Sequence, residues 1–422
     1  MSTEPPSPLH APSLANVVEA ARQLVGVSRV TPVELNERLS ARHGAEVYLK
    51  REDLQGVRSY KIRGAYNFMA SLTEEQRERG VVCASAGNHA QGVADGCARL
   101  FIHGHIFMPK NTPRQKVSRT RDIGGQQVEL HLVGDTFDAA KEAAEAFCRA
   151  KQLTFIHPFD DPAVIAGQAT IGLEILQEVP DVDAIVVPIG GGGLAAGIGV
   201  VLKGQERPVL LFGAEPAGSP SMQLALQEGH PVTLEEMDPF VDGAAVRRAG
   251  DLTLSLCRDA LEDLVLVPEG RICTEMIALY QRDGVIAEPA GALAVAALDQ
   301  LTPRLGGQKV VCVVSGGNND LARYSEVVER SLIYEGLRHY FVINFSQRAG
   351  SLRRYIDEAL GETDDIIRFE YLKRTTREFG PALVGIELAR RDDYEPLMER
   401  MRALGLSFSE LTPESPAYAL LV

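Results

Sequence analysis

The sequence predicts an α/β protein in which a large region with parallel sheets is followed by a small C-terminal βαββαβ unit. Apolar runs of strand length alternate with helical patterns up to about residue 335, and a different order of strands and helices follows. Hydrophobic residues make up 45% of the 422 residues and charged residues 24%, so the chain can bury a large core. Global disorder is therefore excluded.

Five apolar runs in the large region have the length of a strand. They do not alternate with polar residues, so both faces of each strand are expected to be buried. Buried strands separated by helical segments are typical of parallel sheets covered by helices on both faces. The runs are VVCAS (81–85), HIFMP (105–109), AIVVPI (184–189), PVLLFGAE (208–215) and KVVCVVS (309–315).

The C-terminal unit is expected to start with a strand at 339–345 and to continue with a helix. Leu352, Tyr355, Ile356, Ala359 and Leu360 follow the 0, 3, 4, 7, 8 spacing of one helix face. Two strands, a second helix and a last strand are predicted at 366–372, 382–389, 397–404 and 406–411. This βαββαβ order is of the split ferredoxin-like kind, and residues 325–336 are expected to form the connecting helix.

The chain is expected to have three parts. Residues 1–12 contain four prolines and are predicted to form a flexible arm, residues 13–335 form the large region with two α/β subdomains, and residues 336–422 form the small unit. The 43 basic and 57 acidic residues give a net charge of −14, which disfavours nucleic acid as a partner.

The sequence also predicts a cytoplasmic protein. It has neither a membrane-length apolar run nor the basic and apolar regions of a signal peptide. The six cysteines form no CxxC pair and no metal-ligand spacing, so we expect reduced thiols and no bound metal.

Three glycine-rich turns follow predicted strands, and the first is the most informative. Gly190, Gly191, Gly192, Gly193 and Leu194 precede an Ala-rich helical segment, where backbone N–H groups and the helix dipole favour a phosphate. A plain strand-to-helix turn is the alternative. The run also satisfies the dinucleotide pattern GxGxxG with Ala195 at its end, but the acidic residue that should follow about 20 positions later comes only at Glu215, 25 positions on.

The second and third turns combine small residues with hydroxyl and amide side chains. Ser85, Ala86, Gly87, Asn88 and His89 offer donors to a carboxylate or a ring oxygen, although for this turn considered alone, ordinary helix capping and a packed histidine are the favoured explanation. The third turn, from Ser315 to Asp320, has the same two interpretations.

Lys61 is expected in the first turn of a helix within RSYKIRGA (58–65). A lysine there opposes the helix dipole, which lowers the pKa of the amine and suits it to Schiff-base chemistry. An ordinary surface lysine is the alternative.

Together these segments resemble the fold-type II (tryptophan synthase beta-like) pyridoxal-phosphate enzymes, and among them the threonine dehydratases, or threonine ammonia-lyases, in their short biosynthetic form. The resemblance covers roughly residues 15 to 422, and its motifs occur in that family's order. They are YLKREDLQ (48–55), SYKIRGA (59–65), SAGNHAQG (85–92), PIGGGGLAAG (188–197), IAEPAGA (286–292) and VVSGGNND (313–320). The small unit resembles the single ACT-like regulatory domain of such enzymes.

The resemblance implies roles for individual residues. Lys61 matches the lysine that forms a Schiff base with pyridoxal phosphate, Asn88 the partner of the ring 3′-oxygen, and Ser315 the partner of the pyridine nitrogen. The run from Gly190 through Gly191, Gly192 and Gly193 to Leu194 matches the phosphate loop, and the run from Ser85 through Ala86, Gly87 and Asn88 to His89 matches the substrate loop.

The implied reaction is the elimination and deamination of L-threonine to 2-oxobutanoate and ammonia, the first step of isoleucine synthesis, with L-serine as an alternative substrate. Isoleucine or valine is expected as an effector at Arg348, Gly350, Ser351 and Leu352, where a plain strand-to-helix turn is the alternative. A homo-oligomer, a dimer or a tetramer, is expected because a single ACT-like unit needs a partner.

Three competing functions and one departure from the family pattern stay open. A serine racemase is the nearest competitor, but this chain has Ala86 where the resemblance places that enzyme's second catalytic serine. An inactive amino-acid sensor and an NAD-dependent oxidoreductase are the second and third. The departure concerns the family's divalent-cation site, which is half present, with Glu215 matching and Ser221 departing.

Overall fold

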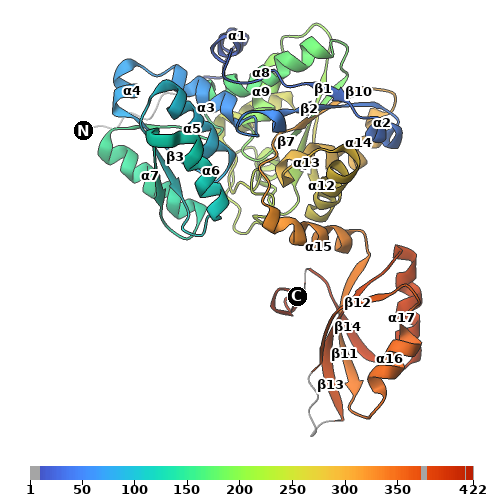
Figure 1. Ribbon diagram of the computed structural model, residues 1–422. Helices are drawn as coiled ribbons and strands as arrows, with labels where there is room; N and C mark the ends of the chain where they lie inside the picture. Colours follow the sequence, from blue (N-terminus) through green and yellow to red (C-terminus); the bar gives the residue numbers. More distant parts are fainter. Residues whose placement is uncertain (1–9, 372–377, 414, 422) are drawn as a thin grey trace. The chain divides into compact units, whose positions relative to one another are not determined.

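The computed structural model describes residues 10–371, 378–413 and 415–421, which divide into two compact units, one up to Leu321 and one from Ala322 (Figure 1). Of the predicted arm, residues 1–9 lie outside the described residues. The first helix, α1 (Leu14–Gln23), begins after Ser13, whose Oγ accepts a hydrogen bond from the Asn16 N–H at 3.3 Å. No helix in the described ranges has the length and apolar character needed to cross a membrane.

The larger sheet of the first unit has six strands in the order β1-β2-β10-β7-β8-β9, parallel except for the pair β1 and β2. Every residue of β7 is buried, as the unbroken apolar run predicts, and α9 and α13 are among the helices that pack near it. The strands are β1 (Val33–Leu35), β2 (Glu46–Arg51), β7 (Ala184–Pro188), β8 (Leu210–Pro216), β9 (Asp263–Val267) and β10 (Lys309–Val314).

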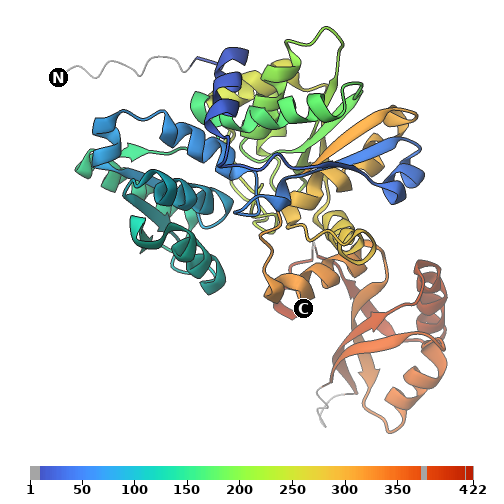
Figure 2. The same ribbon diagram turned by 45° about the horizontal axis from the view of Figure 1, so that its top comes forward.

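The smaller sheet is wholly parallel, in the order β5-β4-β3-β6, and helices cover it (Figures 1 and 2). Its strands are β3 (Val81–Ala84), β4 (Gly104–Met108), β5 (Val128–Leu132) and β6 (Thr154–Phe155). The helices of the first unit after α1 are α2 (Glu37–His43), α3 (Lys61–Ala70), α4 (Glu74–Arg79), α5 (Asn88–Leu100), α6 (Arg114–Gly124), α7 (Phe137–Lys151), α8 (Pro162–Glu178), α9 (Gly193–Leu202), α10 (Ser221–Glu228), α11 (Asp251–Ala260), α12 (Glu269–Asp283), α13 (Pro289–Ala296) and α14 (Leu298–Leu305).

The second unit has the predicted βαββαβ order after a leading helix. Its antiparallel sheet runs β12-β13-β11-β14, and alternate residues of β11 such as Phe341 and Phe345 pack with Tyr355 of α16 and Met401 of α17. The elements are α15 (Tyr324–Tyr334), β11 (Arg338–Ser346), α16 (Ser351–Ala359), β12 (Asp365–Tyr371), β13 (Phe379–Glu387), α17 (Tyr394–Ala403), β14 (Ser407–Leu411) and α18 (Tyr418–Leu421). Residue 372, the last of one predicted strand, lies outside the described residues.

The predicted fold class is confirmed, and each predicted strand differs from its observed bounds by three residues or fewer at either end. Five further strands of the large region were not predicted, namely β1, β2, β5, β6 and β9. These strands are short or partly exposed, so they lack the long apolar run that marks the buried centre of a parallel sheet.

Candidate active site

The order of strands brings three of the sequence motifs to one edge of the larger sheet. β10 lies between β2 and β7 and is parallel to both, so the segments that follow these three strands leave the sheet at the same edge. The segment after β2 is joined to the turn after β10, because the Tyr60 N–H donates to the Ser315 carbonyl at 3.1 Å and Ser59 forms a bridge with Gly316. Lys61 therefore lies beside the turn at Ser315.

Lys61 is the first residue of α3, as the sequence predicts. Its Nζ donates to the Pro158 carbonyl at 2.9 Å, and burial lowers the pKa of the amine to about 8, against a smaller opposing effect of the Glu288 carboxyl. In a substantial share of the molecules, the Lys61 amine is therefore neutral near physiological pH. A neutral amine can act as a nucleophile or accept a proton.

A buried ion network anchors the helix that carries Lys61. Arg63, two residues further along α3, is 1% exposed and binds Glu52 at 2.7 Å and Glu174 of α8 at 2.5 Å. Lys50 of β2 also contacts Glu174 at 2.6 Å. The network joins α3 to the sheet and to α8, so the start of α3 is fixed from two sides.

The glycine loop after β7 meets the requirements of a phosphate site. Gly192 has φ +88, α9 begins at Gly193, and the residues from Gly191 to Leu194 are buried. Among the hydrogen bonds of the described residues, none uses a backbone N–H of residues 190–194 as its donor. Buried N–H groups without an acceptor at a helix N-terminus fit a bound phosphate, so the loop fits pyridoxal phosphate.

The back of this loop packs against a fixed aromatic ring. A Cβ placed on Gly191 would lie 2.3 Å from the Phe159 ring, and one on Gly193 would lie 2.9 Å from the Phe159 Cβ. The Thr253 hydroxyl donates to the Gly191 carbonyl at 2.6 Å. Only glycine leaves the loop close enough to these groups for its N–H groups to keep their present direction.

The turn after β3 places the second motif at a helix start. α5 begins at Asn88, and the Gly87 N–H donates to the Ser85 Oγ at 3.2 Å, with Ala86 between them partly buried. His89 is buried, its Nε2 contacts the Ile156 carbonyl at 3.1 Å, and burial lowers the pKa of the imidazole to about 3. His89 is therefore neutral and packed.

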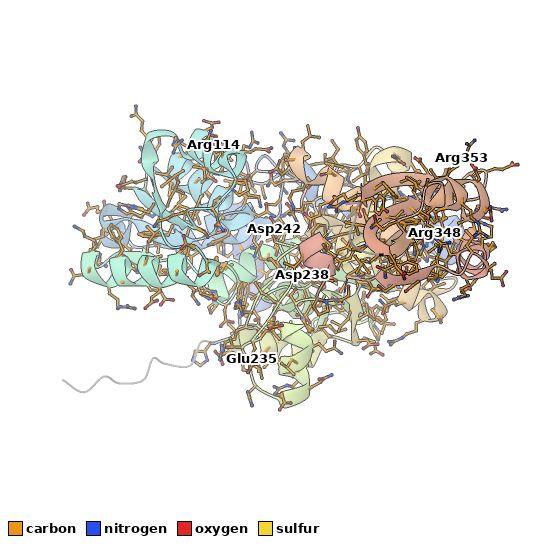
Figure 3. The ribbon with its side chains drawn as sticks, turned by 90° about the horizontal axis from the view of Figure 1, so that it is seen from below. Arg114, Glu235, Asp238, Asp242, Arg348 and Arg353 are labelled. Atoms are coloured by element: carbon orange, nitrogen blue, oxygen red, sulfur yellow. The ribbon has the colours of Figure 1, made fainter. Side chains whose placement is uncertain are left out.

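The carboxyl group of Glu288, for which no motif predicts a role, joins the second and third motifs. The Asn88 Nδ2 donates to Glu288 Oε1 at 2.5 Å, and the Asn318 Nδ2 donates to Asn88 Oδ1 at 2.8 Å. Burial, together with the negative charge of Asp242, raises the pKa of Glu288 to about 7. Asp242 itself forms an ion pair with Lys116 of α6 and is labelled in Figure 3.

The remaining predicted residues of the first unit have ordinary structural contacts. Ser315 is buried, and its hydroxyl donates to the Ala290 carbonyl at 3.1 Å. Glu215 accepts the N–H groups of Met222 and Gln223 at the start of α10, at 2.7 and 2.9 Å, and burial raises the pKa of its carboxyl to about 8. Both carboxyl oxygens of Glu215 thus accept N–H groups of the first turn of α10 and cap its start.

The four residues predicted to bind an effector line one pocket in the second unit. Arg348, Gly350, Ser351 and Leu352 surround a volume of about 490 Å³ at the start of α16, and Gly350 has φ +89. Arg348 and Arg353, labelled in Figure 3, line the same pocket.

Comparison with known proteins identifies the family. Residues 26–316 match the model of the family described as pyridoxal-phosphate dependent enzyme. The chain belongs to this family. Residues 329–421 match the C-terminal regulatory domain of threonine dehydratase. Pyridoxal phosphate is thus the cofactor of this enzyme, as predicted, and the hypothesis of an NAD-dependent oxidoreductase is excluded.

Full-length relatives extend the match to the whole chain. The protein named L-threonine dehydratase biosynthetic IlvA from Bacillus subtilis strain 168 is 50% identical over 408 residues, 96% of this chain and 97% of the relative. The protein of the same name from Mycobacterium tuberculosis H37Rv is 50% identical over 421 residues, with coverage of 99% and 97%. The predicted membership in the threonine dehydratase family is confirmed.

Solved structures agree with this placement. Threonine deaminase isoform 2 from Solanum lycopersicum has a TM-score of 0.72 and 37% identity, covering 79% of this chain and 94% of its own. Maize serine racemase has a TM-score of 0.71 and 30% identity, covering 77% and 99%. The fold is therefore shared by dehydratases and racemases, and the sequence match distinguishes them.

Proposed function

We propose that this enzyme converts L-threonine to 2-oxobutanoate and ammonia, with Lys61 as the base that removes the α-proton. The observation that carries the proposal is the Lys61 amine, whose pKa is lowered to about 8 at the edge where the three motif-bearing segments meet. Bound pyridoxal phosphate withdraws electrons from the substrate α-carbon and so makes its proton acidic.

The cofactor would be held by residues of three different loops. The N–H groups of Gly191, Gly192 and Gly193 would hold its phosphate, Asn88 would face the ring oxygen, and Ser315 would face the ring nitrogen. A serine hydroxyl does not enforce protonation of that nitrogen, which restrains electron withdrawal. This restraint suits an elimination, because the β-hydroxyl leaves as soon as the α-proton is removed.

The substrate carboxylate would bind the loop from Ser85 to His89. The N–H groups at the start of α5 and the Ser85 hydroxyl are donors of the right kind, and they would turn the α-hydrogen toward Lys61. Loss of the α-proton and of the β-hydroxyl, together one molecule of water, leaves an enamine, which takes up one water and releases the oxoacid and ammonia. Ala86 has no hydroxyl to return a proton from the opposite side, so elimination is favoured over racemisation.

The second unit is proposed to bind isoleucine or valine. Arg348 and the N-terminus of α16 would bind the carboxylate, and Phe345, Leu352 and Ile356 would contact the branched side chain. Binding would lower the affinity for threonine through a coupling of about 1–3 kcal/mol. The enzyme is proposed to be an even-numbered homo-oligomer, a dimer or a tetramer. It is proposed to act in the cytoplasm, where its six cysteines would stay reduced.

The test of the catalytic proposal combines a spectrum with a coupled oxoacid assay on threonine, serine and their D-isomers. Lys61→Ala should abolish both turnover and the visible absorbance of the lysine-bound cofactor, whereas the exposed Lys203→Ala should keep both. Borohydride reduction followed by peptide mapping should label Lys61. A label on another lysine would refute the assignment, and a bound cofactor without ammonia release would favour an inactive sensor.

The test of the effector site uses the same assay with isoleucine and valine. Arg348→Ala removes a charged hydrogen bond of about 1.5–3 kcal/mol to the effector carboxylate, so the effector concentration for half inhibition should rise by about 10- to 150-fold. Arg390→Ala, which removes an exposed arginine outside the pocket, should leave it unchanged. An intact enzyme that responds to neither amino acid at any threonine concentration would show that the second unit has no feedback role.

A further inference from the structure

A cluster of histidines and one carboxylate lies on the smaller sheet, apart from the proposed active site. His103 precedes β4, His105 belongs to β4, and Glu129 and His131 belong to β5. His103 and His105 are two positions apart, and the register places His105 opposite Glu129. Because side chains alternate between the faces of a strand, all four side chains share one face of the sheet.

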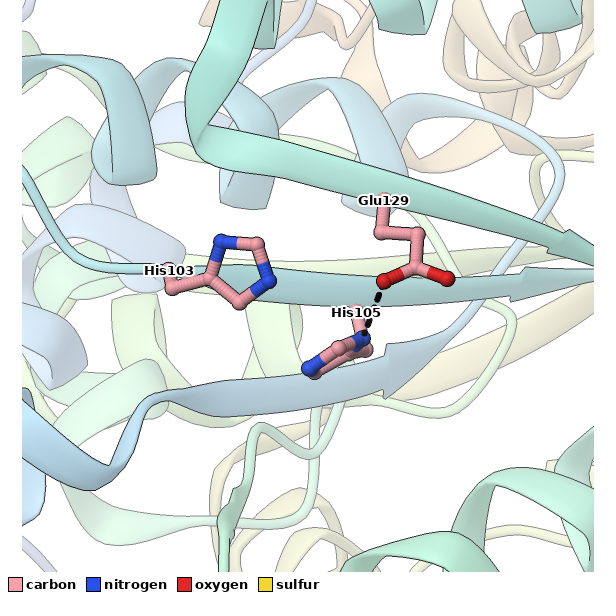
Figure 4. Close-up of side chains that lie close together, drawn as sticks. All are labelled: His103, His105 and Glu129. Atoms are coloured by element: carbon pink, nitrogen blue, oxygen red, sulfur yellow. Dashed lines mark ion pairs between the residues drawn. The ribbon is translucent and has the colours of Figure 1, made fainter.

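The distances in this cluster suit a shared ligand. Ligand atoms of His103, His105 and Glu129 all lie within 4.8 Å of one another (Figure 4). His105 Nδ1 lies 3.6 Å from Glu129 Oε2, and the nearest contact of His131 is to His105, at 3.0 Å between ring nitrogens. His103 and Glu129 are exposed, so a dissolved ion can reach them.

Aromatic rings hold two of the imidazoles in place. The ring of His131 stacks on Phe107, with centroids 4.4 Å apart, and the ring of His105 packs edge-on to Phe147 of α7 at 4.8 Å. The inner side of the cluster is thus apolar and ordered, and its outer side is open. This packing orients the imidazole ring of His105 before a ligand binds.

We propose that His103, His105 and Glu129 bind a divalent transition-metal cation of the Zn²⁺ class. Imidazole nitrogen and carboxylate oxygen are the ligands these ions prefer, and three protein ligands leave a position for water. Bonds of about 2.0–2.1 Å place tetrahedral ligand atoms about 3.3 Å apart, so the set must close by roughly 1.5 Å at most. The exposed side chains of His103 and Glu129 can make that movement by rotation.

The position of the site predicts a structural role for the ion. β5 is an edge strand, and an ion shared by His105 and Glu129 would join it to β4. The histidines lie at the start of β4, whereas the proposed substrate loop follows the end of the neighbouring parallel strand β3. Metal binding should therefore stabilise the smaller sheet and leave turnover of threonine unchanged.

The experiment uses the full-length enzyme with its cofactor, freed of metal by a chelator that is then removed. Titration with Zn²⁺ against a chromophoric zinc indicator should give one ion per chain. His103→Asn and Glu129→Gln change exposed residues and should each weaken binding by about tenfold or more, while His230→Asn, at an exposed histidine elsewhere, should not. Zn²⁺ should also raise the unfolding midpoint of the wild type, and less so that of either variant.

Two results would overturn the proposal. One is wild-type binding that is absent or unaffected by His103→Asn and Glu129→Gln. The other is a thiolate charge-transfer band in the Co²⁺-substituted wild type, lost in Cys148→Ser, because it would assign the ion to the partly buried Cys148. The Co²⁺ spectrum of the wild type decides the ligand type even if a variant fails to fold.

Discussion

Replacing Gly191 by alanine tests the idea that close packing behind the glycine loop sets the geometry of the phosphate site. The added Cβ would lie 2.3 Å from two carbons of the Phe159 ring, well inside contact distance. The ring cannot easily turn away, because its backbone N–H is held by His157 Nδ1 at 3.3 Å and the two rings pack edge to face at 4.7 Å. The loop must therefore move instead, and its N–H groups move with it.

The expected size of the effect follows from the cost of overpacking. Inserting a methyl group into a well-packed site costs about 1–3 kcal/mol. If the loop relaxes by giving up its present direction, this cost appears as weaker cofactor binding, and the dissociation constant of pyridoxal phosphate should rise by about 5- to 150-fold. Gly56→Ala is the matched control, because nothing lies within 4 Å of its added Cβ and its φ is not positive.

The assay is a titration of the apoenzyme with pyridoxal phosphate, followed by absorbance, in a double-mutant cycle with Phe159→Ala. Removing the ring should recover most of the affinity lost in Gly191→Ala, giving a coupling of about 1 kcal/mol or more. Affinity equal to that of the wild type in Gly191→Ala, or a loss that Phe159→Ala does not relieve, would refute the packing argument.

Three further predictions concern ionisable side chains of the first unit. Arg63→Met should lower the free energy of unfolding by about 3–5 kcal/mol in urea titrations, because the wholly buried Glu52 loses its partner. Arg99→Met, which removes an ion pair on the surface of one helix, should change it by at most about 1 kcal/mol. Equal effects of the two substitutions would contradict this prediction. The rate at which the apoenzyme takes up pyridoxal phosphate should rise with pH and level off above about 8, as the Lys61 amine loses its proton; a pH-independent rate between pH 6 and 9 would oppose the lowered pKa. The raised pKa of Glu288 means that the folded wild type keeps a proton that the unfolded chain releases from about pH 4.5, so the wild type loses stability as the pH rises to about 7. Glu288→Gln has no carboxyl group to titrate, so its free energy of unfolding should rise by up to about 3 kcal/mol relative to that of the wild type across this range. Unfolding midpoints of both proteins at pH 5 and pH 8 measure this difference.

Much of the fold could be predicted from local patterns. An unbroken apolar run such as β7 or β10 identifies a strand buried on both faces, and the helix spacing after residue 351 identifies α16. Edge strands such as β5, whose residues are all exposed or only partly buried, were not predicted. The reason is that periodicity reports burial, and an edge strand is only half buried.

The individual motifs of the candidate site could be predicted from the sequence, but the contacts between them could not. Lys61, the glycine loop and the turn at Ser315 each carry a local signal, since a helix start or a strand-to-helix turn restricts the residues that fit there. Glu288 carries no such signal, although it lies within one of the motifs on which the family resemblance rests. Its bond to Asn88 joins residues 200 positions apart.

By itself, the sequence determined where strands, helices and glycine turns form, because side-chain direction repeats with the backbone dihedral angles of each element. It also determined the family, through six motifs in a fixed order. Only the tertiary structure decided which turns meet: β10 lies between β2 and β7, so Lys61, Ser315 and the glycine loop reach one edge of the sheet. The same holds for the unusual pKa values of Lys61 and Glu288, since burial and neighbouring charge are properties of the assembled site.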